Sequence, residues 1–278
     1  MQPYATATGT ISTLEGLSEA GWGMLLTPDS WARSRLHFAI DHAMPIAIDN
    51  GAFAAYLQRK DWAKAYEWKF VKLVRRVSMH APELLTWIVA PDIVAGGLES
   101  LELSASWIPT IMIPVQDGMT PADLRPLLEE HPGELGIFLG GSTEWKWKTC
   151  QQWGRLAAEF GVPYHVARVN TQRAFRLSHG CGATSVDGTG VVQYPGTLER
   201  LERAREEIRR GGAQLALELN PREEREAEMT LVRAMEKAGS AMLSAVTEAD
   251  HHKGKSRVAQ QVALAALQEL VGVLPSGS

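Results

Sequence analysis

The stretch TIMIPVQDGMTPADLRPLLEEHPGELGIFLGGS, residues 110–142, decides the fold. It begins with an apolar segment of strand length, continues as an amphipathic helical pattern at Pro121–Glu129, and returns to an apolar segment at Leu135–Leu139. Buried strands of a parallel sheet have this continuous apolar character, and a crossover helix connects each strand to the next. The stretch is therefore predicted to form a β–α–β unit.

The same alternation extends over most of the chain. The predicted strands are Trp22–Thr27, Pro45–Asp49, Trp87–Ala90, Thr110–Val115, Leu135–Leu139, Tyr164–Ala167, Ala183–Val186 and Ala213–Leu217. The predicted helices are Ser30–Ala43, Trp62–Ser78, Pro121–Glu129, Trp145–Phe160, Thr171–Ser178 and Leu198–Arg210. Eight strands predict a closed (β/α)8 TIM-like barrel, because an open doubly wound sheet fits a count of six better. We expect one domain over 1–272 and a flexible tail over 273–278.

The composition is that of an ordinary globular protein. The 278 residues are 45% hydrophobic and 22% charged, which excludes a collagen-like or wholly disordered chain. No apolar run approaches the ~20 residues of a membrane helix, and residues 1–20 lack the pattern of a signal peptide. A cytoplasmic protein that does not contact membranes is expected. Two cysteines, Cys150 and Cys181, are too few for a disulfide framework or a four-cysteine zinc site.

Polar or glycine-rich motifs follow the predicted strands at six places. They are Asp49-Asn50-Gly51, Pro91-Asp92, Gln116-Asp117-Gly118, Gly140-Gly141-Ser142, Arg168-Val169-Asn170 and Ser185-Val186-Asp187-Gly188. Any one of them is explained by an ordinary turn. Because the carboxyl ends of barrel strands converge on one face, the whole set predicts a single shared active site.

Asp49 and Asp187 are the strongest catalytic candidates, since each directly follows an apolar strand. Two carboxylates in one pocket suit metal binding, general acid–base catalysis or nucleophilic attack at a sugar anomeric carbon. Metal binding is disfavoured because no histidine accompanies them at ligand spacing. His165 lies inside a predicted strand and is interpreted as a buried structural histidine. We expect no metal and no cofactor.

The ordered set of motifs resembles the tRNA-guanine transglycosylase family, which includes a branch that inserts 7-deazapurines into DNA. The resemblance extends over about residues 20–190. The matching motifs are Asp49-Asn50-Gly51-Ala52-Phe53, Val89-Ala90-Pro91-Asp92, Val115-Gln116-Asp117-Gly118, Gly140-Gly141 and Ser185-Val186-Asp187-Gly188-Thr189.

The resemblance implies a base exchange in which Asp187 attacks C1′ of a flipped-out nucleotide. The departing base leaves a covalent glycosyl-aspartate, and a free 7-deazaguanine-type base then displaces the aspartate with net retention. Phe53, in the first matching motif, is expected to contact the substrate. No cofactor is implied.

The resemblance also implies how a guanine-like base is bound. Asp92 accepts hydrogen bonds from the base N1–H and its exocyclic amine. Gln116 and a backbone N–H of Gly140 or Gly141 bind the O6 acceptor. Asp49 orients the base or carries its proton.

The chain departs from family members that act on tRNA. Those enzymes carry a zinc site of three close cysteines and a histidine after the nucleophile, whereas here Cys181 precedes Asp187 and no cysteine follows it. The run Gly188–Gly190 replaces the family's Pro-Thr-Arg segment. DNA is therefore the expected partner, in preference to tRNA. If water accepts the sugar instead of a base, the protein is a DNA glycosylase that leaves an abasic site.

Nucleic-acid contacts are predicted at a local patch, since a net charge of −4 gives the whole chain no basic character. In the segment 144–148, Trp145 is a candidate for base stacking, and Lys146 and Lys148 are candidates for phosphate binding. The alternative is that the tryptophan belongs to a helix core and the lysines to its solvated face. Arg168 is a candidate for contact with the substrate backbone.

Residues 250–256 (DHHKGKS) approximate a phosphate-binding loop. That motif requires glycine where Ala249 stands, so a nucleotide site is disfavoured. Lys253 and Lys255 are candidates for contacting the nucleic-acid backbone; the alternative is a helix lead-in capped by Ser256.

Two rivals differ in class from base exchange and base excision. The first is a catalytically silent nucleic-acid-binding subunit, which would have no need of both Asp49 and Asp187. The second is a barrel lyase for a small metabolite, of which Gly188-Thr189-Gly190 is a weak phosphate-site signal. The sequence predicts no oligomeric state.

Overall fold

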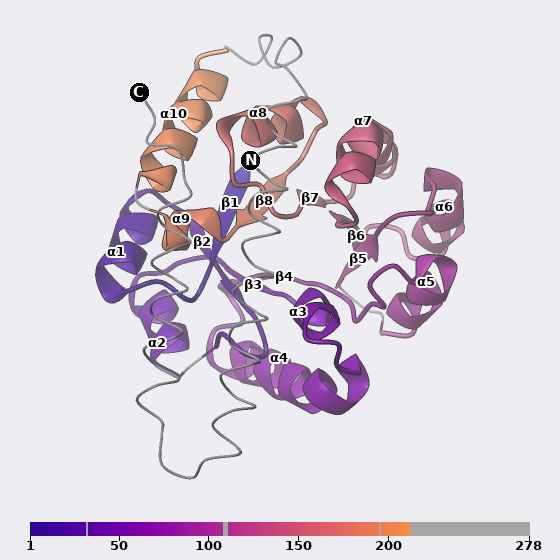
Figure 1. The fold of residues 1–278 in the computed structure, drawn as a ribbon, viewed down its shortest axis with the longest axis horizontal. Coiled ribbons are helices and arrows are strands. Elements are labelled where there is room, and N and C mark those ends of the chain that lie inside the picture. Colours follow the sequence, from indigo (N-terminus) through magenta and orange to yellow (C-terminus); the bar gives the residue numbers. More distant parts are fainter. Residues whose placement is uncertain (32, 108–110, 195, 212–278) are drawn as a thin grey trace, which may run out of the picture. The chain divides into compact units, whose positions relative to one another are not determined.

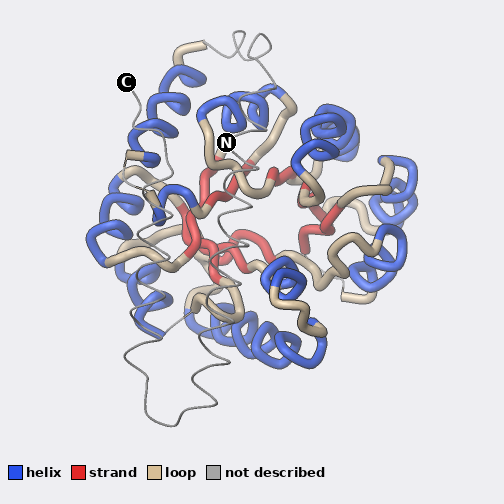
Figure 2. Tube along the Cα trace, viewed as in Figure 1, coloured by secondary structure: helices blue, strands red, loops and turns tan. Residues whose placement is uncertain are grey.

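The computed structural model describes residues 1–31, 33–107, 111–194 and 196–211. Its eight strands form one parallel sheet in the order β4-β3-β2-β1-β8-β7-β6-β5, with helices around the outside (Figures 1 and 2). The two edge strands approach each other through a parallel bridge between Val89 and Met112. The predicted (β/α)8 barrel is confirmed, and it is nearly closed.

The strands are short, as barrel strands are. Their bounds are β1 Gln2–Thr6, β2 Gly23–Leu26, β3 Ile46–Ile48, β4 Leu85–Ile88, β5 Ile111–Val115, β6 Leu135–Leu139, β7 Tyr164–Val166 and β8 Ser185–Gly188. The helices are α1 Ile11–Glu19, α2 Arg33–Asp41, α3 Ala52–Leu57, α4 Trp68–His80, α5 Gly97–Ala105, α6 Pro121–Glu130, α7 Thr143–Phe160, α8 Gln172–Gly180, α9 Gly190–Gln193 and α10 Thr197–Arg209. A π-helical turn, η1 (Ala63–Glu67), leads directly into α4.

Seven of the predicted strands and all six predicted helices are confirmed. The first strand, β1, was not predicted, although it lies between β2 and β8 in the sheet. The remaining predicted strand, Ala213–Leu217, lies outside the described residues. So do the rest of the predicted domain beyond residue 211 and the tail over 273–278.

Side chains fill the interior of the barrel. The imidazole of His165 stacks on Phe138 with ring centroids 5.0 Å apart, and it lies 4.5 Å from the ring of Trp87. Tyr4 packs edge-on against Trp87 at 5.2 Å. Because this interior is packed, chemistry has room only at the rim where the strands end.

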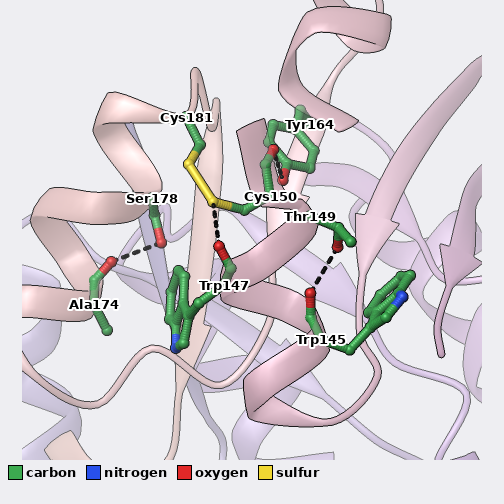
Figure 3. Close-up of a disulfide and its surroundings, with 8 residues drawn as sticks. All are labelled: Trp145, Trp147, Thr149, Cys150, Tyr164, Ala174, Ser178 and Cys181. Atoms are coloured by element: carbon green, nitrogen blue, oxygen red, sulfur yellow. Dashed lines mark hydrogen bonds between the residues drawn. A yellow bond between two sulfur atoms is a disulfide. The ribbon is translucent and has the colours of Figure 1, made fainter. Parts of the chain in front are cut away.

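A disulfide ties two outer elements together. Cys150 of α7 and Cys181 at the end of α8 are bonded, with their Cα atoms 5.9 Å apart (Figure 3). A Cβ atom on Gly154 would lie 1.7 Å from the carbonyl oxygen of Cys181, so glycine is required for this close approach. The Tyr164 hydroxyl donates to the Cys150 carbonyl at 2.8 Å, which connects the same turn of α7 to β7.

Helix termini follow from the local sequence. The Thr171 hydroxyl accepts a hydrogen bond from the Ala174 N–H at the start of α8, and Thr120 forms a capping box with Asp123 at the start of α6. Gly161 ends α7 in the left-handed conformation. Among the residues that the structure describes, no helix has both the length and the hydropathy to cross a membrane.

Candidate active site

Asp187 lies on β8 and is only 7% exposed. Its Oδ1 accepts hydrogen bonds from Nε2 of His165 at 2.9 Å and from the backbone N–H of Arg168 at 3.2 Å. Within the described ranges no hydrogen bond reaches Oδ2. One carboxylate oxygen is therefore anchored, while the other is available to react.

His165 has a second partner that fixes its tautomer. Its Nδ1 lies 2.8 Å from the hydroxyl oxygen of Ser185, and its side chain is fully buried. Because the carboxylate of Asp187 can only accept, the proton resides on Nε2 and the Ser185 hydroxyl donates to Nδ1. The interpretation of His165 as a buried, hydrogen-bonded histidine is correct, but the sequence did not show that Asp187 is one of its partners. His165 pairs with Ser185 across β7 and β8, and Asp187 is two residues further along on the same face.

Arg168 follows β7 with a left-handed backbone, at a φ of 57°. Such a conformation costs a non-glycine residue roughly 1–3 kcal/mol, and here it places the backbone N–H on Asp187. The guanidinium donates to the Gly141 carbonyl and lies 4.9 Å from the ring centroid of Phe53. Arg168 and Phe53, both predicted substrate contacts, therefore contact each other, and 41% of Phe53 remains exposed.

Asp49 and Asp92 are connected through Asn50. The Asn50 amide donates to Oδ1 of Asp92 at 2.8 Å and to the Ala90 carbonyl at 2.5 Å. Oδ1 of Asp49 accepts the N–H of Gly51 at 2.6 Å. The loops after β3 and β4 are thus held together, with both predicted carboxyl groups at the same end of the barrel.

Both of these carboxyl groups hold protons unusually well. Burial, opposed by the Gly51 hydrogen bond and assisted by the charge of Asp187, raises the pKa of Asp49 to about 6. Burial also raises the pKa of Asp92 to about 7, with a contribution from the charge of Asp49. Near neutral pH each group can therefore exchange a proton, which is the property required of a general acid or base.

These raised pKa values predict a pH-dependent stability. In the unfolded chain an aspartate titrates at about 4, so the stability contributed by the protonated carboxyl is present at low pH and is lost as pH rises through about 7. Asp92→Asn removes the titration and keeps the acceptor for Asn50. We expect the free energy of unfolding of the variant, relative to wild type, to be about 3 kcal/mol higher at pH 8 than at pH 4.5, measured by chemical denaturation. A gain that is the same at both pH values would contradict this assignment.

Gln116, predicted to bind the base, is held by the loop that follows β4. Its Nε2 donates to the Ile93 carbonyl and to the Ser100 hydroxyl, each at 2.7 Å, and its Oε1 accepts the Ala95 N–H at 2.6 Å. Both amide hydrogens are therefore used within the protein. Binding of a base O6 by this amide remains a prediction, and it requires one of these bonds to break.

Replacement of Gln116 tests which partner matters. We expect Gln116→Ala to lower the free energy of unfolding by about 2–3 kcal/mol, because three hydrogen bonds disappear and the buried Ser100 loses a partner. The matched control is Gln151→Ala on the exposed face of α7, with no expected change. Unaltered stability together with lost base discrimination would show that Gln116 binds the base.

The two predicted backbone donors at Gly140 and Gly141 differ in availability. The N–H of Gly140 donates to the Val115 carbonyl at 3.0 Å, so it is part of the sheet. Gly141 has a φ of 70°, and a Cβ there would lie 2.6 Å from the ring of Trp145. Within the described part of the chain its N–H has no hydrogen-bond acceptor, so of the two glycines Gly141 is the one that can serve a ligand.

Lys146 corrects one prediction of a phosphate contact. Its side chain is 1% exposed, and Nζ donates to the Ala167 carbonyl at 2.7 Å and lies 4.8 Å from the ring centroid of Trp147. The α7 register turns this lysine inward, so it is not a surface cation. Trp145 is partly buried and packs near Trp153, whereas Lys148 is exposed. Contact of Lys148 with nucleic acid stays a prediction. Lys253 and Lys255 lie outside the described residues.

Within residues 1–211, apart from the undescribed gaps, no cluster of three or more histidine, cysteine or acidic side chains has the arrangement to hold a metal ion. The site is instead a group of three aspartates at the ends of β3, β4 and β8, with one histidine beneath Asp187.

Comparison with known proteins adds little to this geometry. No family model and no curated protein matches the chain. Among solved structures, one similar chain is a mandelate racemase/muconate lactonizing enzyme-like protein from Rubrobacter xylanophilus DSM 9941, with 12% identity and a TM-score of 0.42. The match covers 72% of this chain and 59% of the other. At this level the likeness bears on neither substrate nor mechanism.

Proposed function

We propose that this chain is an enzyme that breaks an N-glycosidic bond in DNA, with Asp187 as the nucleophile, and replaces the base with a 7-deazaguanine derivative. The observation that carries the proposal is the state of the Asp187 carboxylate. Oδ1 is anchored by His165 and Arg168, and Oδ2 is left without a partner among the described residues. A held carboxylate with one available oxygen is suited to covalent attack at an anomeric carbon.

The proposed first step forms a bond between Oδ2 and C1′ while the C1′–N bond breaks. The bonding electron pair leaves with the base, which takes a proton. Asp49 and Asp92 are suited to supply it, because their raised pKa values leave them partly protonated near neutral pH. In the second step the incoming base attacks C1′, loses a proton to a carboxylate, and releases Asp187. Two inversions give net retention at the sugar.

Base excision is the second candidate, and the arrangement of Gln116 and Gly140 favours it. Of the donors predicted to bind O6 of an incoming base, the Gln116 amide hydrogens and the Gly140 N–H are already bonded within the protein, and, in the described part of the chain, only the Gly141 N–H among these three residues is left for that acceptor. Hydrolysis requires only a water molecule in the second step. The choice of DNA over tRNA rests on the sequence, which has no cysteine after Cys181.

The deciding experiment is an incubation with duplex DNA and with tRNA, each with and without a 7-deazaguanine precursor. The polymers are then digested to nucleosides and analysed by mass spectrometry. A deazapurine nucleoside that appears only with the precursor supports exchange and identifies the polymer. Abasic sites and free base without precursor support excision. Unchanged nucleosides under every condition would overturn the proposal.

A further inference from the structure

We propose that an exposed surface on α3, η1 and α4 binds the sugar-phosphate backbone of the DNA substrate and stacks one unpaired base on Trp68. We call it the α3–α4 surface, and its members are Tyr56, Lys60, Lys64, Trp68, Lys72 and Arg75. Figure 1 shows the two helices, α3 and α4, after which it is named. The inference rests on the proposed function and names how that site receives its polymer.

Charge is the first observation. Residues 59–76 carry seven basic and two acidic residues, a net charge of +5 within a chain whose net charge is −4. A local concentration of positive charge on an acidic protein marks the place where a polyanion can bind.

The second observation is that, within the described part of the chain, most of these cations form no ion pair. In this segment Lys64 pairs with Asp61 and Lys69 pairs with Asp29. No acidic residue of the described chain forms an ion pair with Lys60, Lys72 or Arg75. Arginines of α10 behave differently, because Arg203, Arg209 and Arg210 each pair with a glutamate on their own helix.

Helix periodicity places these groups on one face. Trp68, Lys72 and Arg75 recur at spacings of four and three residues, so they adjoin one another along α4. The opposite face, with Phe70, Leu73 and Val77, packs in the core. Trp68 is 60% exposed, and Nζ of Lys72 lies over its ring at 5.9 Å from the centroid, so a cation and an exposed aromatic ring adjoin each other here.

The surface is attached to the candidate active site at two points. The indole N–H of Trp62 in the α3–η1 connection donates to the Asn50 carbonyl at 2.8 Å. Phe53 of α3 contacts the guanidinium of Arg168, whose backbone N–H holds Asp187. A strand that delivers a nucleotide to Asp187 at the barrel rim therefore has α3 and η1 as immediate neighbours.

Cations interleaved with exposed aromatic rings are typical of surfaces that bind single-stranded nucleic acid, because phosphates and bases are contacted alternately. An extruded nucleotide also leaves its former partner and neighbours partly unstacked. Trp68 offers a stacking platform for such a base. The occupant we infer is therefore the DNA strand itself.

The test compares two triple variants with the same loss of charge. Lys60→Gln, Lys72→Gln and Arg75→Gln are combined on the α3–α4 surface, and Arg203→Gln, Arg209→Gln and Arg210→Gln are combined on α10 as the control. Binding of a labelled duplex and of a labelled single strand is measured by fluorescence anisotropy over a range of salt concentrations. Each phosphate contact contributes about 0.9 to the slope of log Kd against log salt for a duplex. Relative to wild type, we expect the magnitude of this slope to be smaller by about 2–3 in the α3–α4 variant and by less than about 0.5 in the control.

A separate variant tests stacking. Trp68→Ala is expected to weaken single-stranded DNA binding about tenfold while leaving the salt slope unchanged, since stacking releases no counterions. Unchanged affinity would remove Trp68 from the contact. Equal salt slopes for wild type and the α3–α4 variant would overturn the proposal that this surface binds DNA. Binding of phosphatidylserine vesicles in place of DNA would overturn it as well.

The nucleoside assay separates this inference from the proposed function. If the wild-type protein exchanges or excises a base but the salt slope of DNA binding is the same in the α3–α4 variant, the proposed function holds and the proposed surface is wrong. If the α3–α4 variant has the expected smaller salt slope but the wild-type protein gives no nucleoside product, the proposed surface holds and the proposed function is wrong.

Discussion

Asp187→Asn is expected to abolish covalent capture of DNA and to lower turnover by at least roughly 10³-fold, with DNA affinity changed less than about threefold. The amide has the shape of the carboxylate, and its oxygen can still accept from His165 and from the Arg168 N–H. It lacks the negative charge that makes the other oxygen a nucleophile. Binding therefore survives while bond formation fails.

Covalent capture is measured as a shifted band on a denaturing gel and as an adduct mass on the peptide that contains residue 187. Asp117→Asn is the matched control, because Asp117 also follows a strand but accepts hydrogen bonds from the N–H and hydroxyl of Ser142. The control is expected to keep wild-type capture. Turnover of Asp187→Asn near the wild-type rate would remove Asp187 from the role of nucleophile.

His165→Phe is expected to lower kcat roughly 10²-fold while changing KM for DNA less than about threefold. Phenylalanine fits among the rings of Trp87 and Phe138, but it provides no donor for Oδ1 of Asp187. The carboxylate then loses the bond that orients it and can rotate away from the line of attack. His165 is a positioning residue in this account, since it acts only through Asp187.

Ser185→Ala provides a graded comparison for the histidine. It removes the bond to Nδ1 of His165 and leaves the bond from Nε2 to Asp187 in place. We expect a loss of kcat of about 3–10-fold, between wild type and His165→Phe. If both variants change kcat and KM by similar factors and also show a large fall in Tm, the role of His165 is purely structural.

The parts of the fold that the sequence predicted are those with a strong period. Apolar runs such as Leu135–Leu139 identify strands, and the helical spacing of apolar residues over Trp62–Ser78 identifies a helix. β1 was missed because its five residues include Gln2, Pro3 and Thr6, and only its position between β2 and β8 makes it a strand. α5 was missed because it begins at Gly97 directly after Gly96, a pair that resembles a loop.

The sequence placed the candidate residues but not their hydrogen bonds. Gln116 follows a strand and Lys146 lies on a helix, as predicted, yet their polar atoms are directed into the protein. Such directions depend on the helix register and on loops that meet only after folding. The partnership of His165 with Asp187 was missed for a related reason. Alternation along a strand is visible in a sequence, whereas the register between two neighbouring strands is not.

β1 makes assembly of this site depend on the last strand that the structure describes. Tyr4 pairs in register with Asp187, so the first strand made and the last described strand form one seam. A nascent chain that has not yet reached β8 has neither the nucleophile nor a partner for that edge of β1. Contacts between residues so distant in sequence raise the contact order of the fold, and a high contact order is associated with slow folding. The candidate site is therefore complete only after β8 has been made and has paired with β1.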